Sequence, residues 1–186
     1  TLLLNATWTN DKRDSLIYTT SGSLQRAYAE VGLPGADLKF YKLNYQHQKF
    51  FPLTKEITLM LNGEFGLGDG YSGETLPFFR NFYAGGMGSV RGFKSGSLGP
   101  KDVYPNEENA LGGNRRLVGN AEFLMPVPGF GLDKSFRFGG FFDAGYVWAT
   151  GEKMRLSDLR YSVGVSVAWA SPFGPLKVSV AQPLNK

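Results

Sequence analysis

Residues 56–67, EITLMLNGEFGL, decide the fold. Every second position from Ile57 to Leu67 is apolar or glycine, while the positions between them hold mainly polar or small residues. Because successive side chains of a β-strand point to opposite faces, this alternation predicts a strand with one apolar and one polar face. Its length of about ten residues is enough to cross a bilayer at a tilt.

The same pattern continues on both sides of this segment. The sequence contains about eight candidate strands, which are residues 2–8, 24–31, 38–51, 56–67, 117–127, 136–148, 161–169 and 176–181. Residues rich in Gly and Pro separate them and predict turns at 21–23, 32–37, 126–129 and 172–175. Strands joined in series as hairpins predict an all-β, antiparallel sheet with no defensible helix.

The composition agrees with an all-β protein. Aromatic residues make up 15% of the chain, with 25 Gly, 15 Phe and 9 Tyr, and the mean hydropathy is −0.21. The sequence contains no run of about 18 apolar residues, so it predicts no transmembrane helix. Barrel strands give a much weaker hydropathy signal. The absence of Cys, the single His47 and a net charge of +4 without a Lys/Arg run argue against thiolate or multi-histidine metal sites and against nucleic-acid binding.

Two all-β architectures fit this alternation, a transmembrane barrel and a water-soluble sandwich. The barrel is favoured because short and long connections alternate. It is also favoured because Tyr161 and Trp169 lie at opposite ends of one apolar face, as aromatic girdles do. The opposite face, with Ser162, Gly164 and Ser166, is small and polar and therefore suits a barrel lumen.

The longest connection, residues 68–114, is predicted to be functional because irregular loops of this length are uncommon. It contains FYAGGMGSVRGF at 82–93, in which Val90, Arg91, Gly92 and Phe93 place one guanidinium between apolar side chains. Glycines at this density allow positive φ and close approach of other chain segments.

Strand parity proposes a partner for Arg91. If Phe136, Phe138, Phe142 and Trp148 face lipid, Asp143 and Arg137 face the interior, and the same argument from Phe123 and Met125 places Glu122 there. Unpaired buried carboxylates are costly, and a guanidinium can bridge two of them through charge-assisted hydrogen bonds. The alternative is that Glu122 and Asp143 line a wet lumen while Arg91 points to solvent.

No other pattern predicts chemistry. The glycines at 86–92 miss the dinucleotide-binding spacing, and Ser89, Ser95 and Ser97 have no nearby His. Glu122 and Asp143 could be paired catalytic carboxylates, but no substrate cleft is indicated. Glu107 and Glu108 are expected to be solvated. The sequence therefore predicts no enzyme, no catalytic residue, no metal site and no cofactor.

Several motifs, in order and at matching spacing, resemble a known family. They are residues 77–86 running into 89–93, then 98–100, 112–114, 121–123 with Pro126, 142–148, 169–176 and 181–183. The chain resembles the C-terminal part of the outer-membrane barrel in the bacterial surface antigen superfamily, which includes outer-membrane protein assembly factors.

This resemblance implies that residues 1–186 form a partial transmembrane β-barrel, about eight strands of a 16-stranded barrel. Residues 68–114 match an extracellular loop that folds back into the lumen. There the arginine of its Val-Arg-Gly-Phe motif, matched by Arg91, pairs with acidic residues on the next strands, matched by Glu122 and Asp143.

The implied function is the insertion and folding of β-barrel proteins in the outer membrane of a Gram-negative bacterium. The implied partners are nascent outer-membrane proteins, outer-membrane lipid, and accessory lipoproteins bound through POTRA domains. Those domains, the first half of the barrel and its last strand are expected to lie outside this sequence. A protein-translocation pore of the two-partner-secretion type, in the same superfamily, is the alternative, and a porin-like structural barrel is a third.

Overall fold

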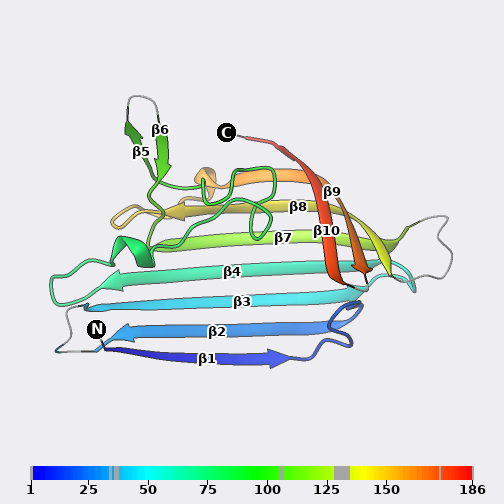
Figure 1. The fold of residues 1–186 in the computed structure, drawn as a ribbon, viewed down its shortest axis with the longest axis horizontal. Helices are drawn as coiled ribbons and strands as arrows, with labels where there is room; N and C mark the ends of the chain where they lie inside the picture. Colours follow the sequence, from blue (N-terminus) through cyan, green and yellow to red (C-terminus); the bar gives the residue numbers. More distant parts are fainter. Residues whose placement is uncertain are drawn as a thin grey trace.

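The computed structural model describes residues 2–33, 35, 38–104, 107–127, 135–171 and 173–185. Eight strands form one antiparallel sheet in the order β1-β2-β3-β4-β7-β8-β9-β10 (Figure 1). Their bounds are β1 Leu3–Asp11, β2 Gly22–Gly32, β3 Phe40–Pro52, β4 Thr58–Gly70, β7 Arg115–Pro126, β8 Phe136–Trp148, β9 Arg160–Ser171 and β10 Gly174–Pro183. The prediction of an all-β antiparallel sheet is confirmed.

The remaining elements lie in connections. A small hairpin of β5 (Lys101–Tyr104) and β6 (Glu107–Ala110) projects from the segment between β4 and β7. The helical elements in the described part of the chain are two single 3₁₀ turns, η1 (Phe78–Arg80) and η2 (Leu156–Asp158). Among these residues no helix is long and apolar enough to cross a membrane.

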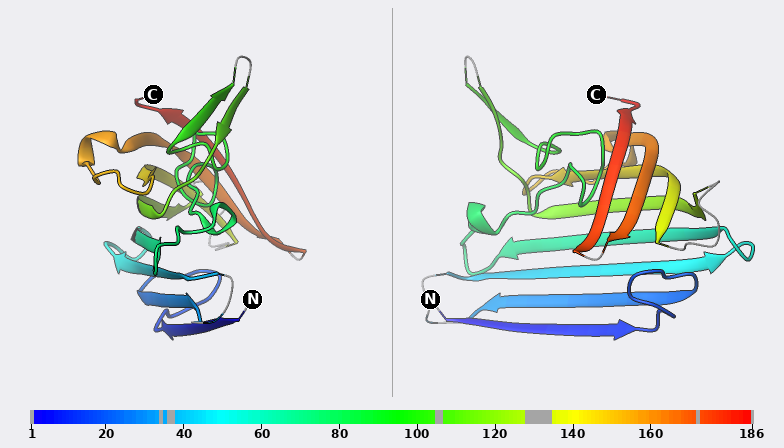
Figure 2. Two further views of the ribbon diagram at one scale, coloured as in Figure 1. Left: turned by 90° about the vertical axis from the view of Figure 1, so that its left-hand side faces the viewer. Right: turned by 45° about the vertical axis from the view of Figure 1, so that its right-hand side comes forward.

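The sheet curls around the segment between β4 and β7. Strands β1 to β4 run side by side. Strands β9 and β10 bend away from them and come forward over the face of the sheet on which the long connection lies (Figure 2). Residues 71–100 run along this concave face, where the backbone bridges Phe82 to Gly113 and Ala84 to Leu98. Because the sheet is curled, strands surround the long connection on more than one side.

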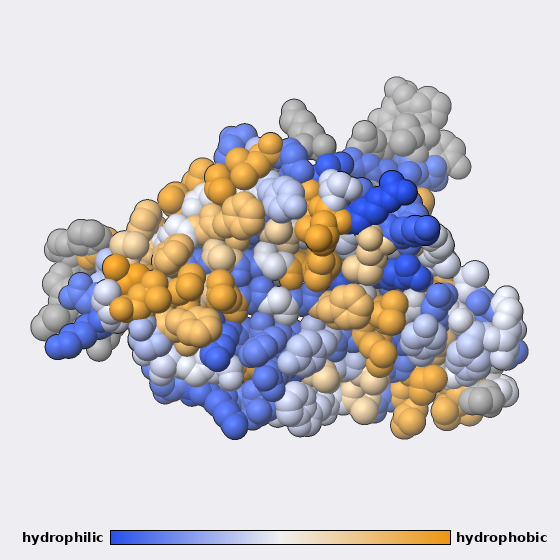
Figure 3. Space-filling model, turned by 180° about the vertical axis from the view of Figure 1, so that it is seen from behind, coloured by the Kyte–Doolittle hydropathy of each residue, from blue (hydrophilic) through white to orange (hydrophobic). Residues whose placement is uncertain are grey.

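Apolar and polar side chains divide between the two faces as the alternation predicts. The apolar parity is exposed on the convex face, which Figure 3 shows as a surface with many hydrophobic residues. It includes Leu43, Leu61, Phe65, Phe123, Phe142, Val163, Val165 and Val167. The other parity is buried and polar, with Glu122, Asp143, Ser162 and Ser166. A soluble sandwich buries its apolar parity, so this arrangement is that of a barrel wall.

Aromatic side chains mark both ends of the apolar face of β9. Trp169 stacks on Phe136 with ring centres 5.2 Å apart, and Tyr161 stacks on Phe142 at 5.8 Å. Trp148 departs from the prediction that it faces lipid, because it is 1% exposed. Its indole N–H donates to Asp158 Oδ2 at 3.0 Å, in the connection that covers it.

Most strands are longer than the sequence pattern indicates. β4 continues to Gly70, which pairs with Phe40, although Asp69 interrupts the apolar parity after Leu67. Gly22 and Gly174, assigned to turns, begin strands β2 and β10. The predicted turns at 32–37, 126–129 and 172–175 include residues 34, 36, 37, 128, 129 and 172, which lie outside the described residues. So do the side chains of Glu107 and Glu108.

Candidate functional site

The Val90–Phe93 motif is held against the concave face by packing on both sides of Arg91. Val90 is fully buried in a cluster with Phe82, Ala84, Leu98, Val118 and Val147, and Phe93 packs against the same cluster. Gly92 has φ +87°, and a Cβ there would lie 3.2 Å from the Cβ of Ala181 on β10. This position therefore needs glycine both for its conformation and for close approach to the wall.

Arg91 makes its main contact with Asp143 on β8. Its Nε and Nη2 donate to the two oxygens of this carboxylate, each at 2.7 Å, and its backbone N–H donates to Oδ2 at 3.0 Å. Arg91 is 5% exposed and Asp143 is 0% exposed. A bidentate, charge-assisted pair of this kind is among the strongest polar contacts that a protein forms.

Glu122 on β7 is the second partner and connects Arg91 to two further strands. Arg91 Nη1 donates to Glu122 Oε2 at 3.2 Å. Ser166 on β9 donates to Oε1 of the same carboxylate at 2.6 Å, and Lys177 Nζ on β10 lies 2.9 Å from it. One buried carboxylate thus receives hydrogen bonds from the loop, β9 and β10.

Phe141 and Asn120 complete the surroundings of the guanidinium. The Cζ atom of Arg91 lies 3.4 Å from the centre of the Phe141 ring, a cation–π contact. Asn120 Nδ2 donates to Asp143 Oδ1 at 2.8 Å and to the Ser89 carbonyl at 2.6 Å, so it joins the wall to the loop directly.

An amide ladder extends from Asn120 across the inner face of the sheet. Asn62 Nδ2 on β4 donates to Asn120 Oδ1 at 2.9 Å, and Gln46 Nε2 on β3 donates to Asn62 Oδ1 at 2.9 Å. A chain of side-chain hydrogen bonds therefore runs from β3 to Asp143. Such chains polarise their members and favour one arrangement of the whole set.

The charge of Arg91 is secure. Burial alone would lower the pKa of its guanidinium, but the hydrogen bonds to Asp143 and the negative charges of Glu122 and Asp143 outweigh burial and raise that pKa above its ordinary value. The cluster of Arg91, Glu122, Asp143 and Lys177 contains two positive and two negative side chains, so it is formally neutral.

A second set of contacts holds the beginning of the same loop. Arg80 Nη1 lies 3.2 Å from Glu30 on β2, and Tyr28 donates to this carboxylate at 3.0 Å. Lys42 Nζ on β3 donates to the Arg80 carbonyl at 2.7 Å and lies 4.3 Å from the centre of the Phe82 ring.

The sequence does not predict these residues as a site. Strand parity places Glu30 and Lys42 on the inner face, but it does not indicate that Arg80 of the loop is their partner.

The structure thus brings together the four motif residues, Glu122 and Asp143. It does not bring Arg137 to this cluster. The guanidinium of Arg137 faces inward but donates to the Thr19 carbonyl at 2.9 Å and to the Tyr18 carbonyl at 3.3 Å, in the connection between β1 and β2. Its inward direction agrees with parity, whereas its partners are backbone carbonyls.

Comparison with known proteins places these features in a family. Residues 1–186 match the family described as Omp85 superfamily domain. The chain belongs to the Omp85 superfamily. The family resemblance inferred from the sequence motifs is therefore confirmed.

Relatives of this Omp85 chain are named as assembly factors. It is 42% identical over 207 residues to the outer membrane protein assembly factor BamA of Neisseria meningitidis serogroup B, a match that covers 96% of this chain and 26% of that protein. A protein of the same name from Nitratidesulfovibrio vulgaris is 29% identical, with 96% and 22% covered. The chain thus spans about a quarter of the length of these relatives.

A solved structure shares the whole fold of this Omp85 chain. It is the crystal structure of BamA from Haemophilus ducreyi lacking POTRA domains 1–3, with a TM-score of 0.90 and 28% identity. The match covers 99% of this chain and 39% of the Haemophilus chain. The curled sheet is therefore similar to part of a known outer-membrane barrel.

The other polar groups considered as a possible reactive centre have structural contacts. Ser89 Oγ accepts a hydrogen bond from the Gly85 N–H at 2.7 Å, which is a loop-stabilising contact. In the described ranges, no three His, Asp or Glu side chains are grouped to hold a metal ion. The Arg91 cluster holds the loop by electrostatic contacts. Arg91 binds Asp143 on β8 and Glu122 on β7, and Glu122 in turn binds β9 and β10.

Proposed function

We propose that the protein containing this chain inserts and folds β-barrel proteins in the outer membrane of a Gram-negative bacterium, as a central component of the assembly machinery. The named relatives support this proposal, since two of them are BamA assembly factors that match nearly all of this chain. The observation that carries it within the molecule is the burial of Arg91 between Asp143 and Glu122, which fixes the long connection inside the curled sheet.

The proposed clients are nascent outer-membrane proteins, and the proposed surroundings are outer-membrane lipid against the exposed apolar face. Accessory lipoproteins would bind through POTRA domains; the crystallised Haemophilus protein lacks POTRA domains 1–3. The segment between β4 and β7 is then the extracellular loop of this part of the barrel. The role requires no catalytic residue and no cofactor.

In this proposal the Arg91 cluster acts as a structural lock. Asp143 and Glu122 bind the loop to β8 and β7, while Ser166 and Lys177 extend the same network to β9 and β10. The lock stabilises the curvature of the wall, so that strand edges elsewhere in the barrel can exchange partners with a client without loss of the barrel. The work done on the client is the pairing of strands and involves no bond-making chemistry.

Complementation of a depletion strain tests this function. The full-length protein with Arg91→Ala is expected to restore less folded outer-membrane protein than the wild type. Lys94→Ala is the matched control, because Lys94 is an exposed cation on the same loop. Full assembly and an unaltered heat resistance of the barrel with Arg91→Ala would refute the role of the lock. Depletion that leaves barrel assembly intact but stops export of a secreted protein would favour the secretion pore instead.

A further inference from the structure

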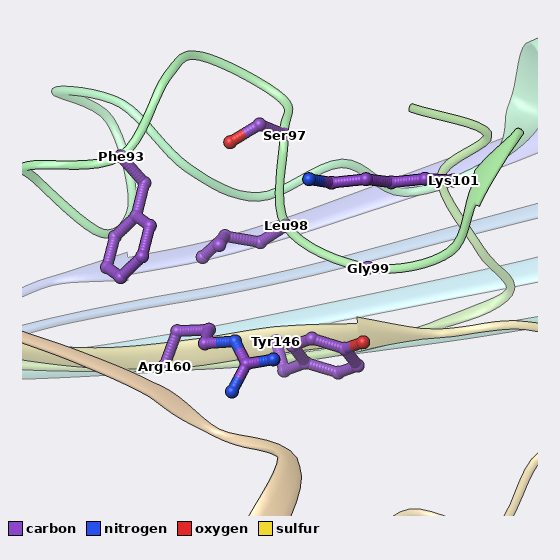
Figure 4. Close-up of a pocket in the computed structure, with 7 residues that line it drawn as sticks. All are labelled: Phe93, Ser97, Leu98, Gly99, Lys101, Tyr146 and Arg160. Carbon is purple, nitrogen blue, oxygen red and sulfur yellow. The ribbon is translucent and has the colours of Figure 1, made fainter. Parts of the chain in front are cut away.

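An apolar groove of about 410 Å³ lies on the convex face of the sheet, across β1 to β4. Its lining on this face consists of alanines and of larger, exposed side chains, which are Trp8, Leu43, Tyr45 and Phe65. The hollow in Figure 4 differs in kind, because there the long connection packs over β8 and β9. The groove on the convex face is formed by strands alone, so its shape is fixed by the sheet.

Strand register gives the groove its shape. Ala27 pairs with Trp8 on β1 and with Tyr45 on β3, so a methyl group lies between two aromatic side chains. In the next outward row, Ala29 pairs with Ala6. Because paired side chains have Cβ atoms about 5 Å apart, these small residues leave a hollow that the neighbouring rings enclose. A chain of methylene groups in this hollow contacts protein on more than one side, and each added contact contributes dispersion energy.

A polar row borders the groove on the side where β1 connects to β2. The next outward positions there are Asn10, Gln25 and His47, which pair in register across β1, β2 and β3. Lys49 follows on the same face of β3, and its ammonium lies 5.0 Å from the centre of the Phe51 ring. In the described part of the chain, no carboxylate forms an ion pair with Lys49. The groove is therefore apolar along its length and is followed by polar and cationic side chains at one end.

We propose that this groove binds one phospholipid of net negative charge, with an acyl chain along the alanines and the headgroup at the polar row. The volume lies within the roughly 300–1,000 Å³ range of ligand sites. The ammonium of Lys49 complements the negative charge of the headgroup. A second copy of the chain is a poorer occupant, because a two-fold axis along the membrane normal would bring a second Lys49 to the same depth.

The leaflet that supplies the lipid rests on the proposed function. The long connection leaves β4 at Gly70, at the other end of the sheet from the polar row. If that connection is extracellular, the polar row lies toward the periplasm and the lipid belongs to the periplasmic leaflet. Binding itself does not depend on assembly, so the two proposals fail separately.

Native mass spectrometry of the full-length protein in detergent tests the proposal, with phosphatidylglycerol as the anionic probe and phosphatidylcholine as the zwitterionic probe. We expect one phosphatidylglycerol to bind in excess of statistical attachment, and a diazirine on its acyl chain to label the peptide that contains Ala27 and Ala29. Ala29→Phe fills the groove and is expected to weaken binding roughly tenfold, as for the loss of about two buried methylene groups. Ala144→Phe is the matched control, since Ala144 lies on the same face of β8 beside Gly119 and does not line the groove.

The position of the headgroup is tested by a second pair of variants. Lys49→Gln is expected to weaken the binding of phosphatidylglycerol roughly fivefold, the effect of one cation near an anionic lipid. Lys55→Gln is the matched control, because Lys55 is an exposed lysine in the connection between β3 and β4. Heat resistance on electrophoresis verifies that each variant is folded. Equal affinities of these two variants would overturn the placement of the headgroup.

Three further results would overturn the proposal. The first is the absence of phosphatidylglycerol beyond statistical attachment. The second is equal weakening by Ala29→Phe and Ala144→Phe, which would show unspecific partition of lipid onto the apolar face. The third is a lipid-free dimer that Ala29→Phe dissociates, which would assign the groove to a second copy of the chain. All three are read as masses, without any assembly assay.

Discussion

Two arginines of the same loop, Arg91 and Arg80, show how differently one side chain type can be used. Arg91 is 5% exposed, and its donors are directed at two buried carboxylates on neighbouring strands. Arg80 has a side chain that is 34% exposed and one ion pair, with Glu30 at 3.2 Å. Both tie the loop to the wall. The difference lies in what remains if the arginine is removed.

Removal of Arg91 leaves the carboxylates of Asp143 and Glu122, which are 0% and 1% exposed, without their guanidinium partner. Removal of Arg80 leaves Glu30 with the Tyr28 hydroxyl as a hydrogen-bond donor and with the ammonium of Lys42 nearby. A buried pair that is broken costs much more than an exposed pair contributes, because the residual charge remains desolvated. Glu30 is itself only 5% exposed, so burial of the partner does not separate the two arginines. They are expected to differ because the Arg80 side chain is 34% exposed and Glu30 keeps the Tyr28 hydroxyl, whereas Asp143 loses the three hydrogen bonds that Arg91 donates.

The largest effect is expected for Arg91→Ala. It should lower the free energy of unfolding of the full-length barrel by about 3–5 kcal/mol, because Asp143 and Glu122 stay buried without their main partner. Heat resistance on electrophoresis and urea unfolding measure this loss, with Lys94→Ala as the control. Arg91→Lys should recover only part of it, since an ammonium cannot reproduce the bidentate fork. A loss below that of Arg80→Ala would contradict the comparison.

The two carboxylates should differ when each is made neutral without a change of shape. Asp143→Asn should cost about 2–3 kcal/mol, because Asp143 accepts three hydrogen bonds from Arg91 and one from Asn120. Glu122→Gln should cost about 1–2 kcal/mol, since Glu122 accepts only one from Arg91 and is also held by Ser166 and Lys177. Urea unfolding of the two variants in parallel gives the order. The reverse order would mean that Lys177, and not Arg91, sets the stability of the cluster.

Part of this site follows from sequence alone. Period-two alternation predicts the inward direction of Glu122 and Asp143, because parity along a strand is a local property. The register between strands is a property of two segments, and so the positions of Ser166 and Lys177 beside Glu122 do not follow from either strand by itself. The pairing of Glu30 with Arg80 spans fifty positions and depends on the path of the loop.

Two departures of the structure from the strand pattern have the same origin. Trp148 has the parity of a lipid-facing residue, but the connection that carries Asp158 folds over it. Asp69 takes the apolar parity of β4 after Leu67, and glycines occupy the other parity at 66, 68 and 70, so the alternation ends before the strand does. Parity states which side of the sheet a residue occupies, and it cannot state what covers that side.

Asn120 tests how much an uncharged side chain contributes to the Arg91 site, because it donates hydrogen bonds to both the loop and Asp143. Asn120→Ala should cost about 1–2 kcal/mol by removing a partly buried amide that donates to both the Ser89 carbonyl and the Asp143 carboxylate. Asn62→Ala, one step further along the amide ladder, should cost less, since the hydrogen bonds of Asn62 in the described part of the chain join it to strand residues. A double-mutant cycle of Asn120→Ala with Arg91→Ala measures whether the two act through Asp143. Additive losses would show that they do not.

The smallest effect is expected for Arg80→Ala, about 0.2–1 kcal/mol, because the Arg80 side chain is 34% exposed and the buried Glu30 carboxylate keeps the Tyr28 hydroxyl and the nearby Lys42 ammonium. This loss should shrink further when the salt concentration is raised from 0.1 to 1 M, since the Debye length falls from about 10 Å to about 3 Å and screens an exposed pair more than a buried one. The loss from Arg91→Ala should be nearly independent of salt. Urea unfolding of both variants at the two salt concentrations provides the test, and an equal dependence on salt would show that the two arginines stabilise the loop by the same means.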